Sequence, residues 1–312
     1  MLEGLGRLVG GVLRLVFLLL AVVVAAHEFA PDTVMRMQRP GLWVRGPDEL
    51  GDGNATPRRP DREEEEDEPG GILFQVADPA RSSSLGTAFK VGGGTLWLTA
   101  NHVVSQCDTV GLDMGTFHAA SVEPGRSIPE ADVAAIHLLA HVPQSLALAS
   151  TPPKRGDVGY HMGFPRGHRA VVISRYLGEA EVAIGSRTRS PVLMWVQKQR
   201  VPDFSGPLSG ISGGPVLDSR GALVGVNIAY SERRGRILTA PPDAIAALLV
   251  AEDAVTFSTA AGQAARPEMG GLPEADSGNE PDLQAAALAA AQAARALERA
   301  GTLRRVFCRV ND

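Results

Sequence analysis

Short apolar stretches separated by turn residues recur between residues 72 and 250. Each stretch is four to seven residues long and is bounded by Gly, Pro or Asp; examples are 86–91, 95–99, 132–136, 170–174, 192–196 and 222–228. Strands at this spacing, with no helical pattern between them, are typical of an all-β barrel or sandwich, whereas βαβ units would place a helix after each strand. The pattern therefore predicts one all-β domain over residues 72–250.

Two segments carry helical signals instead. Pro241 and its neighbours form a start signal before the apolar stretch 244–250, which predicts a short helix at the end of the β domain. Asp282 is a candidate N-cap for an Ala-rich helix over 282–300, with Gly301 at its stop position. The sequence leaves open whether this helix packs on the β domain, on a partner or on neither, because its apolar face consists of only three leucines: Leu283, Leu288 and Leu297.

The N-terminus predicts export. Arg7 and Arg14 precede an apolar run of 12 residues, 15–26, which is short for a bilayer span of about 20 residues but suits the core of a signal peptide. If the run begins at Leu8 with Arg14 reaching the interface, residues 8–26 form an uncleaved anchor in contact with the membrane. Residues 1–26 are therefore a signal peptide or an anchor, and both interpretations stay open.

The remaining segments have the composition of linkers. Residues 27–71 are rich in Pro, Gly, Arg and acids without a sustained period, and residues 251–281 return to Gly, Pro and polar character. Residues 301–312 are assigned as a tail.

Charge and cysteine content exclude several classes of protein. The chain of 312 residues has a formal net charge of −5, and the acidic run 61–68 alone contributes −6, so the other residues sum to about +1. Without a basic excess there is no electrostatic basis for nucleic-acid binding. Two cysteines cannot form a disulfide framework or a zinc ligand set.

The sharpest local signal is a serine among glycines at residues 209–215, Ser-Gly-Ile-Ser-Gly-Gly-Pro. Flanking glycines let the backbone approach a substrate closely and direct its N–H groups at one point, which a nucleophile with an adjacent oxyanion hole requires. A glycine-rich turn between strands would give a similar pattern. The same residues also fit the nucleophile elbow of α/β-hydrolases, so the order of the chemical groups along the chain must decide.

That order excludes the α/β-hydrolases, which need a histidine after the nucleophile. All seven histidines (27, 102, 118, 137, 141, 161 and 168) precede Ser212. The order histidine, acid, serine remains, and it is the order found in chymotrypsin. His102 follows the predicted strand 95–99, and Asp132 begins an apolar strand 30 residues later. These residues supply a base for Ser212 and a carboxylate that orients this base.

Residues Gly86–Val250 resemble the trypsin-like (chymotrypsin-fold) serine peptidases, and more closely the bacterial members related to the high-temperature-requirement proteases. Thr99-Ala-Asn-His102 resembles the histidine motif of this family, Asp132-Val-Ala its aspartate motif and Gly210-Ile-Ser-Gly-Gly-Pro215 its serine motif. The resemblance implies two antiparallel six-stranded β-barrels, at about 72–150 and 154–250, followed by the short helix.

The resemblance also implies a mechanism. Ser212 would attack the scissile carbonyl, His102 would accept its proton, and Asp132 would orient the imidazole ring. The N–H groups of Gly210 and Ser212 would stabilise the oxyanion, and water would resolve the acyl-enzyme.

The resemblance leaves two options for the substrate side chain that the enzyme prefers. By resemblance, Asn227, Ile228 and Ala229 line the first specificity pocket, and Ile228 and Ala229 favour an aliphatic substrate side chain. Asp203 at the base of the pocket would instead select Lys or Arg.

Three departures from the family pattern matter. Ile211 stands where zymogen-activated members carry an aspartate, which argues against that activation route. The paired cysteines around the histidine are missing, but Cys107 and Cys308 could form a disulfide that ties the tail to the first barrel in an oxidising compartment. No stretch after residue 250 is long enough for the PDZ domain that many relatives carry.

We therefore predict a serine endopeptidase that acts on cell-envelope proteins in the bacterial periplasm, soluble or anchored to the inner membrane. It needs neither a cofactor nor a metal, and its partners are protein or peptide substrates and not nucleic acid. Self-association through the Ala-rich helix is a further option. Two other interpretations stay open: a catalytically silent peptide-binding module on the same scaffold, and a membrane-anchored adaptor.

Overall fold

The structure is a computed structural model. It describes residues 44–45, 73–76, 81–115, 118–140, 142–184, 189–232, 234–252 and 283–311. All of these lie in the compact unit Arg39–Asp312. The predicted signal peptide or anchor at 1–26 lies outside the described residues, as do nearly all of the predicted linkers 27–71 and 251–281.

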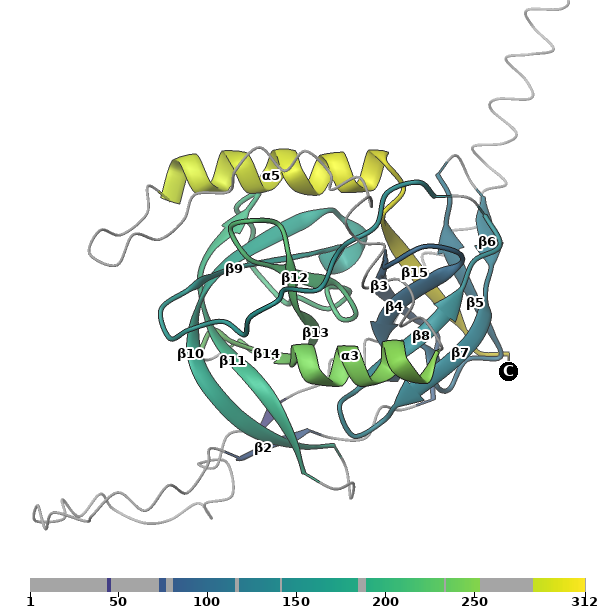
Figure 1. Ribbon diagram of the computed structural model, residues 1–312, viewed down its shortest axis with the longest axis horizontal. Helices are drawn as coiled ribbons and strands as arrows, with labels where there is room; N and C mark the ends of the chain where they lie inside the picture. Colours follow the sequence, from purple (N-terminus) through teal and green to yellow (C-terminus); the bar gives the residue numbers. More distant parts are fainter. Residues whose placement is uncertain are drawn as a thin grey trace, which may run out of the picture. The chain divides into compact units, whose positions relative to one another are not determined.

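The second half of the β domain is a closed six-stranded barrel, as the resemblance predicts (Figure 1). Its strands follow the order β9-β10-β11-β14-β13-β12, and the ring closes because β9 pairs with both β10 and β12. The strands are β9 (Val158–Gly163), β10 (Ala170–Ile184), β11 (Ser190–Val201), β12 (Pro215–Leu217), β13 (Leu223–Ser231) and β14 (Arg236–Ala240).

The first half departs from the predicted six-stranded barrel. It is a seven-stranded sheet in the order β6-β5-β15-β3-β4-β8-β7. The end strands β6 and β7 are consecutive in the chain and separated only by Val122, so the chain itself joins the two ends of the sheet. The strands are β3 (Ser84–Lys90), β4 (Leu96–Ala100), β5 (Thr109–Asp113), β6 (Ala119–Ser121), β7 (Glu123–Ile128), β8 (Val133–His137) and β15 (Leu303–Arg309).

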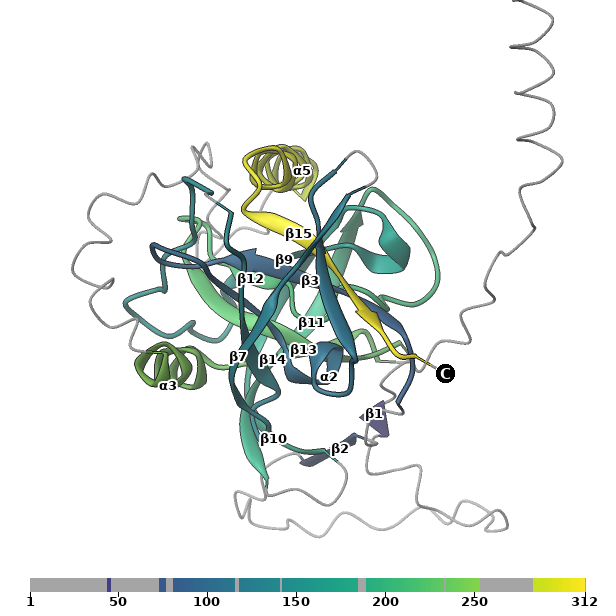
Figure 2. The same ribbon diagram turned by 90° about the vertical axis from the view of Figure 1, so that its right-hand side faces the viewer.

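The strand β15 comes from the segment that we had assigned as a tail. It lies between β3 and β5 and pairs antiparallel with both, Val306 facing Gly86 on one side and Leu112 on the other. Figure 2 shows β15, in yellow, running beside β3. Leu303 and Val306 are completely buried. The strand β15 is therefore an interior strand of the sheet. Its buried apolar side chains form part of the core of that sheet.

The helix α5 (Leu283–Arg299) delivers the chain to β15 and confirms the predicted Ala-rich helix. Its buried face is an alanine stripe that packs on the second barrel and ends in Leu297. The N–H of Thr302 donates to the carbonyl of Leu297 at 2.9 Å, and Gly301 takes a φ of 82°. This left-handed glycine ends the helix and turns the chain into the strand.

Three smaller elements complete the fold. The short helix α3 (Pro242–Ala251) follows β14 as predicted, with Pro242 in its first turn. The strand β2 (Leu73–Val76) adds parallel to the far end of β10, and β1 (Val44–Arg45), within the predicted linker 27–71, pairs with β2. None of the helices described here is both long enough and apolar enough to cross a membrane.

Candidate active site

His102 and Asp132 meet at the end of the first sheet. His102 lies in the one-turn helix α2 (Asn101–Val104), which follows β4 directly, and Asp132 immediately precedes β8, the strand that pairs with β4. The side chain of Asp132 is 1% exposed. Its Oδ2 lies 2.5 Å from Nδ1 of His102, and its Oδ1 accepts the His102 backbone N–H at 2.8 Å. One carboxylate therefore fixes both the ring and the backbone of the histidine.

This contact sets the tautomer of His102. An ionised carboxylate only accepts hydrogen bonds, so the proton of the neutral ring sits on Nδ1 and the lone pair is left on Nε2. Asp132 holds this position with a φ of 54°, an uncommon conformation for a residue other than glycine. The arrangement is that of a general base with a buried carboxylate behind it.

Ser212 lies in a turn, the serine turn, that only the two glycines after it allow. Gly213 has a φ of 82°, and a Cβ there would lie 2.3 Å from both the carbonyl oxygen of Thr87 and Oγ1 of Thr99. A Cβ on Gly214 would lie 2.0 Å from the carbonyl oxygen of Met162. The turn is therefore pressed against the first sheet on one side and the second barrel on the other.

Gly86 on β3 lies close to both the serine turn and α2, the helix that carries His102. A Cβ on Gly86 would lie 2.5 Å from Val103, the neighbour of His102, and 3.2 Å from the carbonyl oxygen of Ser212. That carbonyl also accepts the N–H of Thr87 at 2.8 Å. The segments that carry the predicted nucleophile and the predicted base thus both contact the strand β3.

The N–H groups of Gly210 and Ser212 are available to a ligand. In the described part of the chain neither N–H donates to another backbone group, whereas Ile211 and Gly213 on either side of Ser212 both do. The carbonyl of Gly210 is held away by the Thr87 hydroxyl, which donates to it at 2.7 Å. The Ser209 carbonyl, which shares a peptide with the Gly210 N–H, accepts the N–H of Arg166 at 2.7 Å. This bond fixes that peptide so that its N–H can face a developing negative charge. Sequence reasoning missed Thr87.

β13, which carries the residues predicted to line the specificity pocket, contributes to a buried polar network. Asn227, Ile228 and Ala229 lie on β13, and all three are buried. Oδ1 of Asn227 lies 2.6 Å from Nδ1 of His161, and Nε2 of His161 lies 2.6 Å from the hydroxyl of Ser174. The backbone of Asn227 is also engaged, because its N–H donates to the carbonyl of Gly214 and its carbonyl accepts the N–H of Gly213.

His161 is neutral in this network. Burial lowers the pKa of His161 to about 4, against the smaller raising effect of the hydrogen bond to Asn227. Its ring lies edge-on to Trp195 with 5.4 Å between centroids. Sequence reasoning gave His161 no role, although a histidine, a serine and an asparagine within three apolar strands were a signal of a buried polar cluster.

Asp203 lies outside any enclosed pocket. It is exposed and lines an open cavity of about 450 Å³ together with Arg200, Phe204 and Gly206. The guanidinium of Arg200 stacks on Phe204 at 4.9 Å from the ring centroid and donates to the carbonyls of Phe204 and Gly206. Arg200 therefore supports the loop that leads into the serine turn.

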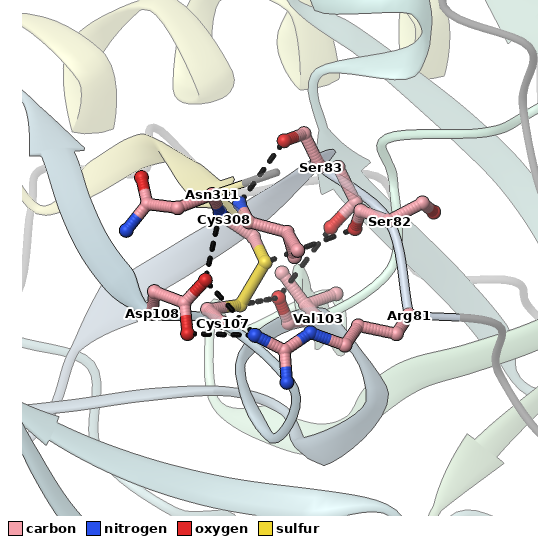
Figure 3. Close-up of a disulfide and its surroundings, with 10 residues drawn as sticks. Arg81, Ser82, Ser83, Val103, Cys107, Asp108, Cys308 and Asn311 are labelled. Carbon is pink, nitrogen blue, oxygen red and sulfur yellow. Dashed lines mark hydrogen bonds and ion pairs between the residues drawn. A yellow bond between two sulfur atoms is a disulfide. The ribbon is translucent and has the colours of Figure 1, made fainter.

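Cys107 and Cys308 form a disulfide, the pairing that the sequence left open (Figure 3). It joins the residues just after α2 to β15 across 201 positions of sequence. Asp108 beside it accepts from Arg81 and from the N–H of Asn311. The histidine helix and the last strand are thus covalently tied.

His137 pairs with a carboxylate and a hydroxyl. Its Nε2 lies 3.0 Å from Glu252 at the end of α3, and its Nδ1 lies 3.1 Å from Oγ1 of Thr95. Among the residues that the structure describes, no three His, Cys, Asp or Glu side chains are grouped as metal ligands would be. His141 lies outside the described residues.

A closed six-stranded barrel and a companion sheet, with few helices, are consistent with the chymotrypsin fold. Residues 86–226 match the protein family described as "Trypsin-like peptidase domain", and the match spans His102, Asp132 and Ser212. This match to a trypsin-like peptidase domain supports a serine endopeptidase, which is a hydrolase.

Several solved proteases are similar to this chain at low identity. The active form of Rv3671c protease from M. tuberculosis is 18% identical with a TM-score of 0.45, and the match covers 62% of this chain and 94% of that one. The HtrA-type protease AlgW with tripeptide is 21% identical with a TM-score of 0.46, covering 57% and 62%. The MamO protease domain from Magnetospirillum magneticum is 19% identical with a TM-score of 0.41, covering 55% and 96%. No curated protein sequence matches.

Proposed function

We propose that this protein is a serine endopeptidase that uses His102, Asp132 and Ser212 as its catalytic triad. The observation that carries the proposal is the contact of His102 with a buried Asp132, which leaves Nε2 of the ring free to accept a proton. The serine turn, packed against the same strand, supplies the nucleophile.

The reaction proceeds in two halves. The Ser212 hydroxyl attacks the scissile carbonyl while Nε2 of His102 takes its proton, and the N–H groups of Gly210 and Ser212 stabilise the oxyanion. His102 then gives the proton to the leaving amine, which breaks the peptide bond and leaves an acyl-enzyme. Water, deprotonated by the same histidine, releases the acyl group and restores the hydroxyl.

The compartment is part of the proposal. A basic, apolar N-terminus is typical of exported proteins, and disulfides such as Cys107–Cys308 persist in oxidising compartments. We place the enzyme in the periplasm, free or membrane-anchored, with envelope proteins as substrates.

Labelling of the full chain with a fluorophosphonate probe tests the proposal. Wild type should be labelled, whereas Ser212→Ala and His102→Ala should not. Ser150→Ala is the matched control, because it removes an exposed hydroxyl outside the serine turn and should leave labelling intact. Labelling that survives Ser212→Ala contradicts the assignment. A folded wild type that binds peptides without labelling or turnover indicates the silent peptide-binding module instead.

A further inference from the structure

Arg305 on β15 joins three parts of the molecule. Its Nε donates to Oδ2 of Asp113 on β5 at 2.8 Å, and its Nη2 binds the same carboxylate. Its Nη1 donates to the carbonyl of Gly167 at 3.3 Å, and its guanidinium carbon lies 5.9 Å from the centre of the Phe164 ring. The last strand therefore reaches the short 3₁₀ turn η2 (Pro165–Gly167) at the start of the second barrel.

The ion pair keeps this arginine in place. Burial by itself raises the pKa of Asp113, but the hydrogen bond from the Gly115 N–H and the charge of Arg305 lower it, and the net shift is downward. Asp113 therefore stays ionised, and it binds two nitrogens of the guanidinium fork. A planar fork held in this way points its remaining nitrogen in a fixed direction, here at the Gly167 carbonyl.

The η2 turn, which Arg305 contacts, supports the serine turn. The N–H of Arg166 donates to the carbonyl of Ser209 at 2.7 Å. The N–H of Phe164 donates to the Thr87 hydroxyl, which in turn donates to the carbonyl of Gly210. A Cβ on Gly210 would lie only 2.4 Å from the carbonyl oxygen of Phe164. The peptide that carries the Gly210 N–H and the peptide after it are thus held by η2 and its neighbour Phe164.

The η2 turn needs such support. Arg166 has a φ of 56° and a ψ of 24° inside it, in the left-handed region that is unfavourable for a residue with a Cβ. A turn held in this conformation persists only where its surroundings determine it. Arg305 binds it from the first sheet through the Gly167 carbonyl and the Phe164 ring.

We propose that Arg305 is a positioning residue for the oxyanion hole, through which the C-terminal strand sets the shape of the Ser209–Gly213 turn. This inference rests on the proposed function and adds to it a residue about 100 positions after the serine, which does not touch the substrate. Arg305 acts through Gly167, Arg166 and Ser209 in turn.

A positioning role predicts a specific kinetic change. The oxyanion hole stabilises the transition state more than the bound substrate, so its misplacement lowers kcat and leaves KM nearly unchanged. We expect Arg305→Gln to lower kcat at least about tenfold, because small displacements of catalytic groups cost factors of this order. Arg309→Gln is the matched control, since it removes the same charge from an exposed position of the same strand.

Backbone amide exchange on the full chain provides a readout that needs no activity. In Arg305→Gln, the N–H groups of Arg166, Ile211 and Gly213 should exchange faster, because they donate the hydrogen bonds that hold the two turns. Arg305→Lys keeps the charge opposite Asp113 but lacks the fork that also reaches Gly167. Arg305→Gln should also lower the free energy of unfolding, because Asp113 loses its charged partner. Arg305→Lys should restore the free energy of unfolding, while amide exchange in the two turns stays fast.

The outcomes separate this inference from the proposed function. Unchanged exchange in Arg305→Gln, or exchange that recovers together with stability in Arg305→Lys, overturns the positioning role. Equal losses of kcat in Arg305→Gln and Arg309→Gln also overturn the positioning role. A wild type that is neither labelled nor active overturns the proposed function, whereas the exchange data still decide whether Arg305 holds the turn.

Discussion

His161 is a single buried residue that links stability to pH. Burial holds the pKa of His161 at about 4, below the usual value near 6.5, so between these values the unfolded chain binds a proton that the folded chain does not. The free energy of unfolding must then fall as the pH falls through this range. A shift of this size corresponds to roughly 3 kcal/mol when complete, and about 2 kcal/mol should be lost between pH 7 and pH 4.5.

Urea denaturation at several pH values measures this effect. Other groups titrate as well, so the decisive quantity is the difference in slope between wild type and His161→Gln. The glutamine variant lacks the titrating ring and should lose less stability on acidification, whatever its stability at pH 7. Parallel slopes for the two proteins would show that His161 is accessible to protons in the folded state.

The residues of the proposed site were readable in the sequence because each belongs to a local motif. His102, Asp132 and Ser212 sit in short segments whose residue types follow from the chemistry they perform. Thr87 and Arg305 sit in no such segment, since their roles depend on distant backbone carbonyls that happen to lie within hydrogen-bonding distance. Positioning residues of this kind become visible only when the strands are placed in space.

The strands and helices were predicted to the extent that their signals are local. Helix α5 was readable from its alanines and Gly301, and the strands of the second barrel from apolar runs between turn residues. β15 was not, because Arg304 and Arg305 interrupt its apolar pattern and its partners β3 and β5 lie about 200 residues earlier. No periodicity within seven residues records such a pairing.

The disulfide acts between two elements, the end of α2 and β15. Cross-linking residues 201 positions apart restricts the unfolded chain strongly, so Cys308→Ser should lower the free energy of unfolding by about 2–5 kcal/mol. Cys107→Ser should cause the same loss. The double variant should be no less stable than either single variant, because each breaks the same bond.

Denaturation under non-reducing conditions, with reductant-treated wild type alongside, measures these differences. Reduced wild type should match the serine variants. A double variant whose loss equals the sum of both single losses would show that the cysteines act separately and not as a disulfide.

The first sheet depends on the strand β15, which lies about 200 residues after its partners. The sheet that carries His102 and Asp132 contains β15 as an interior strand, so a chain that lacks residues 303–312 would leave β3 and β5 without their shared neighbour. We expect this truncated chain to fail to form the first sheet, because two unpaired strand edges and the core side chains of Leu303 and Val306 are lost together. The second barrel has all six of its own strands and should keep its exchange protection.

A shorter truncation and an added peptide make this prediction decisive. Removal of residues 310–312 alone keeps β15 intact and should leave exchange protection in β3 and β5 unchanged. A synthetic peptide of residues 301–312, added to the longer truncation, should restore that protection by occupying the empty place between the two strands. If β3 and β5 are protected in the longer truncation without the peptide, the sheet closes by itself and β15 is only an addition to it.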